Sequence, residues 1–318
     1  LKQSSRFASF VLLSKADYPA ELDIPFPFSL LNNNVSKDRL EVMPAFWWMY
    51  NMYALARNSW KFQSRDKRVN KVQNIEFEPF APDTIEEIFN ALRLLEIWTA
   101  KASLRPESES AKTKNDDVLA DLGRKLLSGK EEVNNNLVVL GENIENTKRK
   151  ALILKPYKAY HAYCDMLYYY AMKNLMTYMS SHPKATFSTM CKDLKSKREQ
   201  DWVNLGGQIM QKSDLDKLRS DIGSGKLNSW NDIHSRYDNL WAKYTVDKQK
   251  HAFATLCELN GTDNLTKAEW NEALKKAVGL QKYVSDQVYV TRKKDYDNPF
   301  VQATFRNLDE MTAAIGTI

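Results

Sequence analysis

The sequence predicts a mainly α-helical fold: a multi-helix domain with a small irregular β segment at its N-terminus. Long stretches without Gly or Pro, opened by N-cap residues, predict the helices. Four prolines crowd residues 1–44, and all ten glycines lie at or after Gly123, so the start of the chain is expected to form short edge strands and bends. We therefore expect an irregular β cap over residues 1–42 and a helical region over residues 43–318.

The first elements follow from local signals. Short strands or extended passes are expected at residues 7–13, 22–31 and 39–42. Pro44 fits the first turn of a helix, and the stretch from there to about Val69 has no Gly or Pro, so one long helix is expected. Asp83 followed by Glu86 matches a capping box and predicts a second helix through about Ser103.

The later elements are also mainly helical. N-cap signatures at Ser229 with Asp232, and at Thr266 with Glu269, open two of these helices. A short strand is expected at residues 137–140, and the helical region is expected to divide near residues 105–117 or 199–212. Helices are expected at residues 116–127, 156–181, 186–198, 213–222, 229–258 and 266–281, with a helical remainder broken at Pro299.

Composition excludes several classes of protein. The net charge of +6 is a small excess, which favours anionic small molecules weakly and makes nucleic acid an unexpected partner. Three cysteines, Cys164, Cys191 and Cys257, form no C-x-x-C pair, which favours a reducing, cytoplasmic location over a disulfide framework. The apolar run from Met43 to Ala56 is too short to span a bilayer, so no membrane partner is expected.

Motifs for common cofactors do not hold. The segment from Gly123 to Lys130 resembles a phosphate loop, but five residues separate its glycines and Glu131 stands where Ser or Thr must bind magnesium. Four histidines occur without metal-ligand spacing. The sequence therefore predicts no metal site, points to no particular cofactor and names no reaction.

Basic residues form a stripe on the helix expected after Pro44. At 100° per residue, four of them fall on one face, and two amides adjoin them: Arg57, Lys61, Arg65 and Arg68, with Asn51 and Asn58. Such a stripe can neutralise a phosphate or carboxylate, which the amides would orient. The alternative is a solvated basic face at the exposed end of a helix whose apolar end is core.

A second candidate site lies on the helix after Pro156. His161 and Asp165 stand four residues apart, so the carboxylate could fix the imidazole tautomer of a general base, and Tyr157 could donate a proton nearby. Cys164 beside His161 ranks below this pair as a nucleophile. The alternative is a hydrogen-bonded core histidine among packed tyrosines.

Three segments resemble an uncharacterised bacterial family, common in Bacteroidetes, in which a left-handed β-helix of hexapeptide repeats precedes a helical half. They are SRFASFVLLSKADYPAELDIPFPFSLLNNN, VMPAFWWMYNMYALARNSWKFQSRDKR and ILKPYKAYHAYCDMLYYYAMKNLM. The resemblance implies that this chain is the later part of a longer protein. It also implies that residues 1–42 are the terminal coils of the β-helix.

Two functions follow as expectations. The first is a helical part of a larger bacterial protein that binds a phosphorylated or nucleotide-linked small molecule through the basic stripe. The second is a non-catalytic helical interaction or structural module that packs on the β-helix or on another subunit. The partners expected are an anionic small molecule, the rest of its own longer chain and a second copy in a homo-oligomer.

Overall fold

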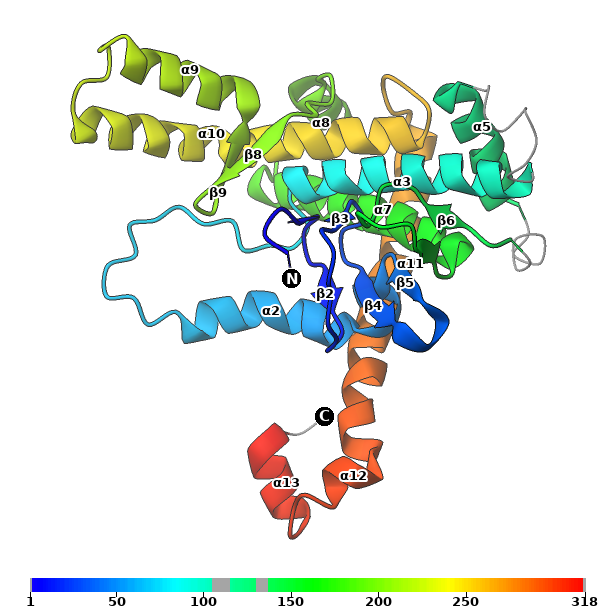
Figure 1. Cartoon of the computed structure of the whole chain (residues 1–318). Helices are drawn as coiled ribbons and strands as arrows, with labels where there is room; N and C mark the ends of the chain where they lie inside the picture. The colour runs from blue at the N-terminus through cyan, green and yellow to red at the C-terminus, as the bar shows by residue number, and fades with distance from the viewer. Residues whose placement is uncertain (1, 105–114, 130–136, 317–318) are drawn as a thin grey trace.

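The computed structural model describes residues 2–104, 115–129 and 137–316. Helices dominate these residues, with small sheets between them, so the mainly α prediction is confirmed (Figure 1). The helices are α1 Phe46–Tyr50, α2 Met52–Arg65, α3 Pro82–Ser103, α5 Asp116–Leu127, α7 Pro156–Ser181, α8 Phe187–Leu194, α9 Lys212–Gly223, α10 Trp230–Leu259, α11 Lys267–Asp297, α12 Pro299–Gln302 and α13 Leu308–Ile315.

The strands of the β cap are short, as the prolines predict. A five-stranded sheet has the order β2-β4-β5-β7-β6, and β1 pairs separately with β3. A short 3-10 turn, Val35–Lys37, joins the antiparallel strands β4 and β5. The strands are β1 Arg6–Phe7, β2 Leu12–Leu13, β3 Asp23–Ile24, β4 Leu30–Asn34, β5 Arg39–Met43, β6 Leu140–Gly141 and β7 Lys150–Ile153.

The first 45 residues stack on themselves at a constant offset. Parallel pairing places Arg6 opposite Asp23 and Leu12 opposite Leu30, which are offsets of 17 and 18 residues. Phe10, Phe28 and Ala45 all have positive φ (59°, 55° and 54°), and they stand 18 and 17 residues apart. The Phe10 and Phe28 rings stack with centroids 4.8 Å apart. The chain therefore turns the same corner three times in succession.

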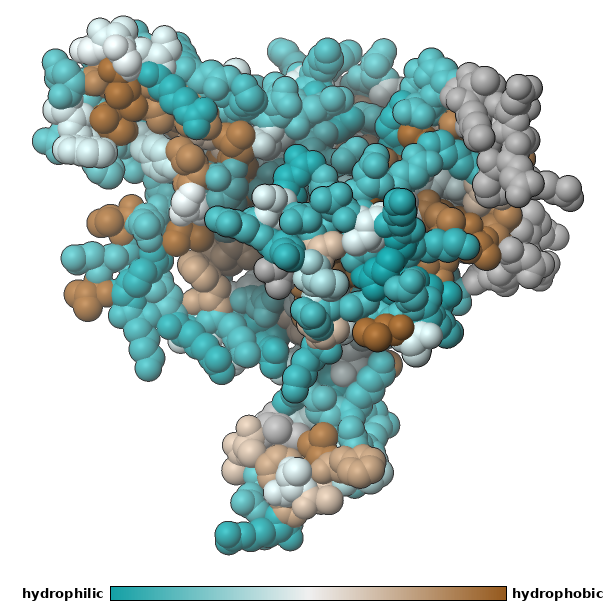
Figure 2. Space-filling view, viewed as in Figure 1, coloured by the Kyte–Doolittle hydropathy of each residue, from teal (hydrophilic) through white to brown (hydrophobic). Residues whose placement is uncertain are grey.

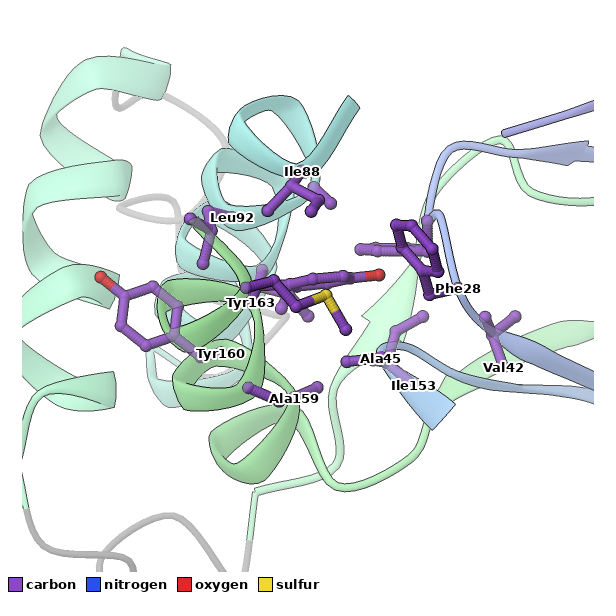
Figure 3. Close-up of a cluster of buried hydrophobic side chains, with 14 of the residues drawn as sticks. Phe28, Val42, Ala45, Ile88, Leu92, Ile153, Ala159, Tyr160 and Tyr163 are labelled. Atoms are coloured by element: carbon purple, nitrogen blue, oxygen red, sulfur yellow. The ribbon is translucent and has the colours of Figure 1, made fainter. Parts of the chain in front are cut away.

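The core joins this β cap to the helices. The Tyr163 ring of α7 lies between Ile88 and Leu92 of α3 on one side and Phe28 of the cap on the other (Figure 3). The hydroxyl of Tyr163 donates to the carbonyl of Pro27 at 2.6 Å. Burial raises the pKa of Tyr163 well above its ordinary value, so the hydroxyl stays protonated and keeps this bond.

Two helix predictions are corrected by the backbone. The single helix expected from Pro44 to Val69 is broken at Asn51 into α1 and α2, and it ends at Arg65. Asp83 and Glu86 do not form a capping box: α3 begins at Pro82 and the hydroxyl of Thr84 accepts the Ala81 N–H at 3.0 Å. The caps at Ser229 and Thr266 are confirmed, although the helix after Thr266 continues to Asp297.

A β-hairpin occupies residues 202–211, within the segment where we expected a boundary. Its strands are β8 Trp202–Leu205 and β9 Gln208–Gln211. Gly206 and Gly207 both have positive φ (66° and 105°), which the two central residues of a tight hairpin turn require. Most of the other expected boundary, residues 105–117, lies outside the described residues, and α5 begins at Asp116 within it.

Glu87 of α3 makes stability depend on pH. Burial raises the pKa of Glu87 to about 7, although the Ser9 N–H donates to its Oε2 at 2.9 Å. Between its unfolded pKa near 4.5 and about 7, the folded state binds more protons than the unfolded state, so the Glu87 contribution to stability falls as the pH rises. We expect Glu87→Gln to gain a few kcal/mol over the wild type at pH 8 relative to pH 4.5. Urea unfolding at both pH values measures this, and identical pH slopes for the two proteins would contradict it.

Candidate functional site

The basic stripe forms on α2, and it consists of Arg57, Lys61 and Arg65. These residues follow one another at intervals of four, and no carboxylate among the described residues lies within ion-pair distance of them. Burial and the neighbouring Arg57 and Arg65 lower the pKa of Lys61. The three cations therefore repel one another in the structure, and an anion placed among them would relieve that repulsion.

A second helix brings another guanidinium to this stripe. The Arg57 guanidinium carbon lies 5.4 Å from the centroid of the Tyr53 ring, and that of Arg292 from α11 lies 4.6 Å from the same ring. Arg292 also forms an ion pair with Asp295 at 3.0 Å. The Nε of Arg57 is buried and has no hydrogen-bond partner among the described residues. Buried donors are normally paired, so this atom is open to an acceptor from a ligand.

The other predicted ligand residues lie beside the stripe or beyond it. Arg68 follows the end of α2, and its guanidinium donates to Asp66 at 2.9 Å and to Gln73 at 2.7 Å. The Arg68 guanidinium lowers the pKa of Asp66 far below its usual range, which marks a firm local pair. Asn51 separates α1 from α2 without capping either helix through its side chain, and Asn58 is half-buried on α2.

The predicted acid–base residues line one pocket of about 380 Å³. His161, Asp165 and Tyr157 of α7 share it with Trp48, Tyr50 and Tyr283. His161 is exposed, so the alternative of a core histidine does not describe it. Its Nε2 donates to the carbonyl of Leu127 at 3.0 Å, and its ring centroid lies 4.5 Å from that of Tyr157.

These three side chains lie together without forming the expected dyad. Asp165 Oδ1 lies 3.5 Å from Lys276 Nζ of α11, and the described contacts include no hydrogen bond between Asp165 and His161. The hydroxyl of Tyr157 donates to the Gly129 carbonyl at 3.0 Å. Burial raises the pKa of Cys164 to about 12, which keeps it a thiol and disfavours it as a nucleophile. The arrangement supplies polar groups at an aromatic pocket and no assembled general base.

Sequence reasoning missed an ionic network beside a larger cleft of about 880 Å³. The cleft lies among residues of α3, α5, α7 and α10, and Arg198 stands at one end of it. The Arg198 guanidinium pairs with Glu86 of α3 and, at 2.6 Å, with Glu258 of α10, and it covers the Phe89 ring at 3.9 Å.

His251 extends this network into the core. Its Nε2 donates to Glu86 at 2.8 Å, and its Nδ1 accepts from the hydroxyl of Tyr170 at 2.9 Å. Burial lowers the pKa of His251, in keeping with this neutral tautomer. No short-range pattern connects these residues, because Glu86, Tyr170 and His251 lie on three helices, and the spacing of Glu86 from Asp83 resembles a helix cap.

Two classes of site are not formed by the described residues. No group of three or more His, Cys, Asp or Glu side chains among them is arranged to hold a metal ion. Within the same part of the chain, no helix combines the length and apolar character that crossing a bilayer requires.

Comparison with known proteins gives one informative relative. The chain is 42% identical, over 317 residues, to an uncharacterized protein of Treponema pallidum (strain Nichols). The alignment covers 100% of this chain and 42% of that protein, so the chain spans about two fifths of the length of its relative. No protein-family model matches the chain, and no solved structure matches it.

Proposed function

We propose that this chain is the helical part of a larger bacterial protein, and that it binds a phosphorylated or nucleotide-linked small molecule through Arg57, Lys61 and Arg65. The observation that carries the proposal is the clustering of these three cations without a carboxylate partner among the described residues. Elsewhere guanidinium groups are commonly paired, as those of Arg124, with Glu96, and Arg198 are.

The chemistry of the stripe suits a phosphate. A guanidinium presents planar, forked N–H donors that match phosphate oxygens, and an ammonium adds a point charge. The unpartnered Nε of Arg57 supplies one such donor, and Arg292 adds positive charge across the Tyr53 ring. Binding a dianion would satisfy the donor and remove the mutual repulsion that lowers the pKa of Lys61.

A thermal-shift screen tests the proposal with sugar phosphates, nucleotides, nucleotide sugars and coenzyme A. A ligand at 100 times its Kd stabilises a protein by about 2.7 kcal/mol, which raises Tm by several degrees. We expect at least one of these compounds to give such a shift, and Arg57→Ala and Lys61→Ala each to abolish it.

Lys217→Ala on α9 is the matched control, because Lys217 is exposed and has no ion pair among the described residues. This variant should keep the full shift. A shift that survives both Arg57→Ala and Lys61→Ala would place the ligand elsewhere and remove the proposal.

A second function, a non-catalytic interaction module, is favoured by the C-terminal arm. The distal half of α11, with α12 and α13, extends away from the other helices (Figure 1). Phe300 and Leu308 on this arm are 86% and 74% exposed. Large apolar side chains in such positions are typical of surfaces that pack on another subunit or on the rest of a longer chain. If none of the screened compounds shifts the Tm of the wild type, this function is preferred.

We also propose that residues 1–45 are terminal coils of a β-helix. The support is the parallel pairing at offsets of 17 and 18 residues and the three corners at Phe10, Phe28 and Ala45. Three hexapeptides, one per side of a triangular coil, span the same length. An experimental structure of the longer Treponema protein tests this, because residues without such coils before the region equivalent to Arg6 would remove the proposal.

A further inference from the structure

Positive charge is concentrated in one lobe of the molecule, residues 56–74, which we call the basic lobe. It contains six basic residues and one acidic residue, Asp66, so its net charge is +5 in a chain whose total is +6. It comprises most of α2 and the start of the segment leading to α3, and it projects to the left of the helical body in Figure 1. The basic residues are Arg57, Lys61, Arg65, Lys67, Arg68 and Lys71.

Apolar side chains are exposed among these charges. Trp60 is 63% exposed, Val69 is 97% exposed and Val72 is 82% exposed. In Figure 2 the projecting lobe is largely hydrophilic, with separate hydrophobic patches at its outer edge. A solvated basic face has no need of two fully presented valines and a tryptophan, so these residues indicate a partner with an apolar layer behind a negative surface.

We propose that the basic lobe docks on a membrane surface rich in anionic lipid headgroups, with Trp60, Val69 and Val72 entering the interface. This rests on the proposed function, because the phosphates that the stripe neutralises would be those of the headgroups. Basic residues near an anionic leaflet each strengthen binding by about fivefold, and tryptophan is enriched at the boundary between headgroups and acyl chains. Nucleic acid would use the cations and could stack on Trp60, but it offers no apolar layer for the valines.

The earlier expectation of no membrane partner concerned spanning segments. It depends on the length of an apolar run, which decides whether a helix crosses a bilayer. Docking on the surface needs only a cationic lobe with a few apolar side chains at its tip. The basic lobe meets that requirement without any long apolar helix.

Vesicle co-sedimentation of the full chain tests the proposal. One set of vesicles is pure phosphatidylcholine, and the other contains about one third phosphatidylserine. We expect the chain to sediment with the phosphatidylserine vesicles alone, and binding to weaken as salt is raised. The double variant Val69→Ser, Val72→Ser should weaken vesicle binding by about tenfold. Val278→Ser is the matched control, because Val278 is 71% exposed on α11, outside the lobe, and it should bind as the wild type does.

The outcomes separate this inference from the proposed function. A small phosphorylated ligand that binds while vesicles do not would overturn membrane docking and leave the proposed function standing. Vesicle binding that the valine variant retains would overturn apolar insertion. Binding of a single-stranded oligonucleotide with no binding to vesicles would also overturn the inference. Vesicle binding that is lost in both the valine variant and Lys61→Ala supports it.

Discussion

Replacing Gly123 with alanine should cost at least about 3 kcal/mol of folding free energy, because α5 packs on α3 with no room for a side chain. A Cβ at Gly123 would stand 1.8 Å from the carbonyl oxygen of Glu96 and 2.4 Å from its carbonyl carbon. Both atoms belong to the backbone of α3, so no side-chain rotation relieves the overlap and the two helices must move apart. Chemical denaturation of the purified variant measures the loss.

Gly279→Ala is the matched control for this substitution. Gly279 lies inside α11, and a Cβ there would meet nothing within 4 Å. Alanine is favoured over glycine inside a helix by up to about 1 kcal/mol, so this variant should be slightly more stable than the wild type. If Gly123→Ala also proves as stable as the wild type, α3 and α5 are not in the close contact described here.

The second large effect is expected at Arg198, where Arg198→Met should cost about 3–5 kcal/mol. The side chains of Arg198 and Glu86 are only 10% and 15% exposed, so the substitution leaves a poorly solvated carboxylate facing a neutral histidine. Glu86 would then favour protonation of His251, whose pKa the Arg198 charge helps to lower. The variant should therefore lose less stability in mild acid than at pH 8.

A double-mutant cycle isolates the pair. Glu86→Gln removes the stranded charge, so the double variant Arg198→Met, Glu86→Gln should recover part of the loss. Arg6→Met is the control for a surface pair, since the side chains of Arg6 and Asp23 are 80% and 44% exposed, and it should change stability little. Additive losses in the double variant would show that Arg198 and Glu86 do not interact as described.

Local signals in the sequence identify the elements that local interactions determine. Ser229 and Thr266 cap α10 and α11 because their hydroxyls accept N–H groups only three residues away. Asp83 and Glu86 have the same spacing, yet Glu86 is drawn to Arg198 and His251 on distant segments, and a capping rule cannot include such partners. The hairpin at residues 202–211 was missed because it is short and its turn depends on two adjacent glycines.

The candidate site divides in the same way. Arg57, Lys61 and Arg65 share a helix, so their common face could be predicted from helical spacing alone. The contribution of Arg292 could not be, because it depends on α11 packing against α2 more than two hundred residues later in the chain. Arg68 was assigned to the stripe because the end of α2 at Arg65 has no Gly or Pro to mark it.

The parallel pairing of β5 with β7 fixes an order of events during synthesis. Arg39 lies opposite Lys150, so β5 waits for about 110 further residues before its second neighbour in the sheet exists. At ordinary rates of translation this takes roughly 5 to 20 seconds. During that time Leu40 and Val42, which are fully covered in the finished fold, remain open to the solvent. The nascent chain therefore presents a temporary binding site for chaperones until α7 follows β7 off the ribosome.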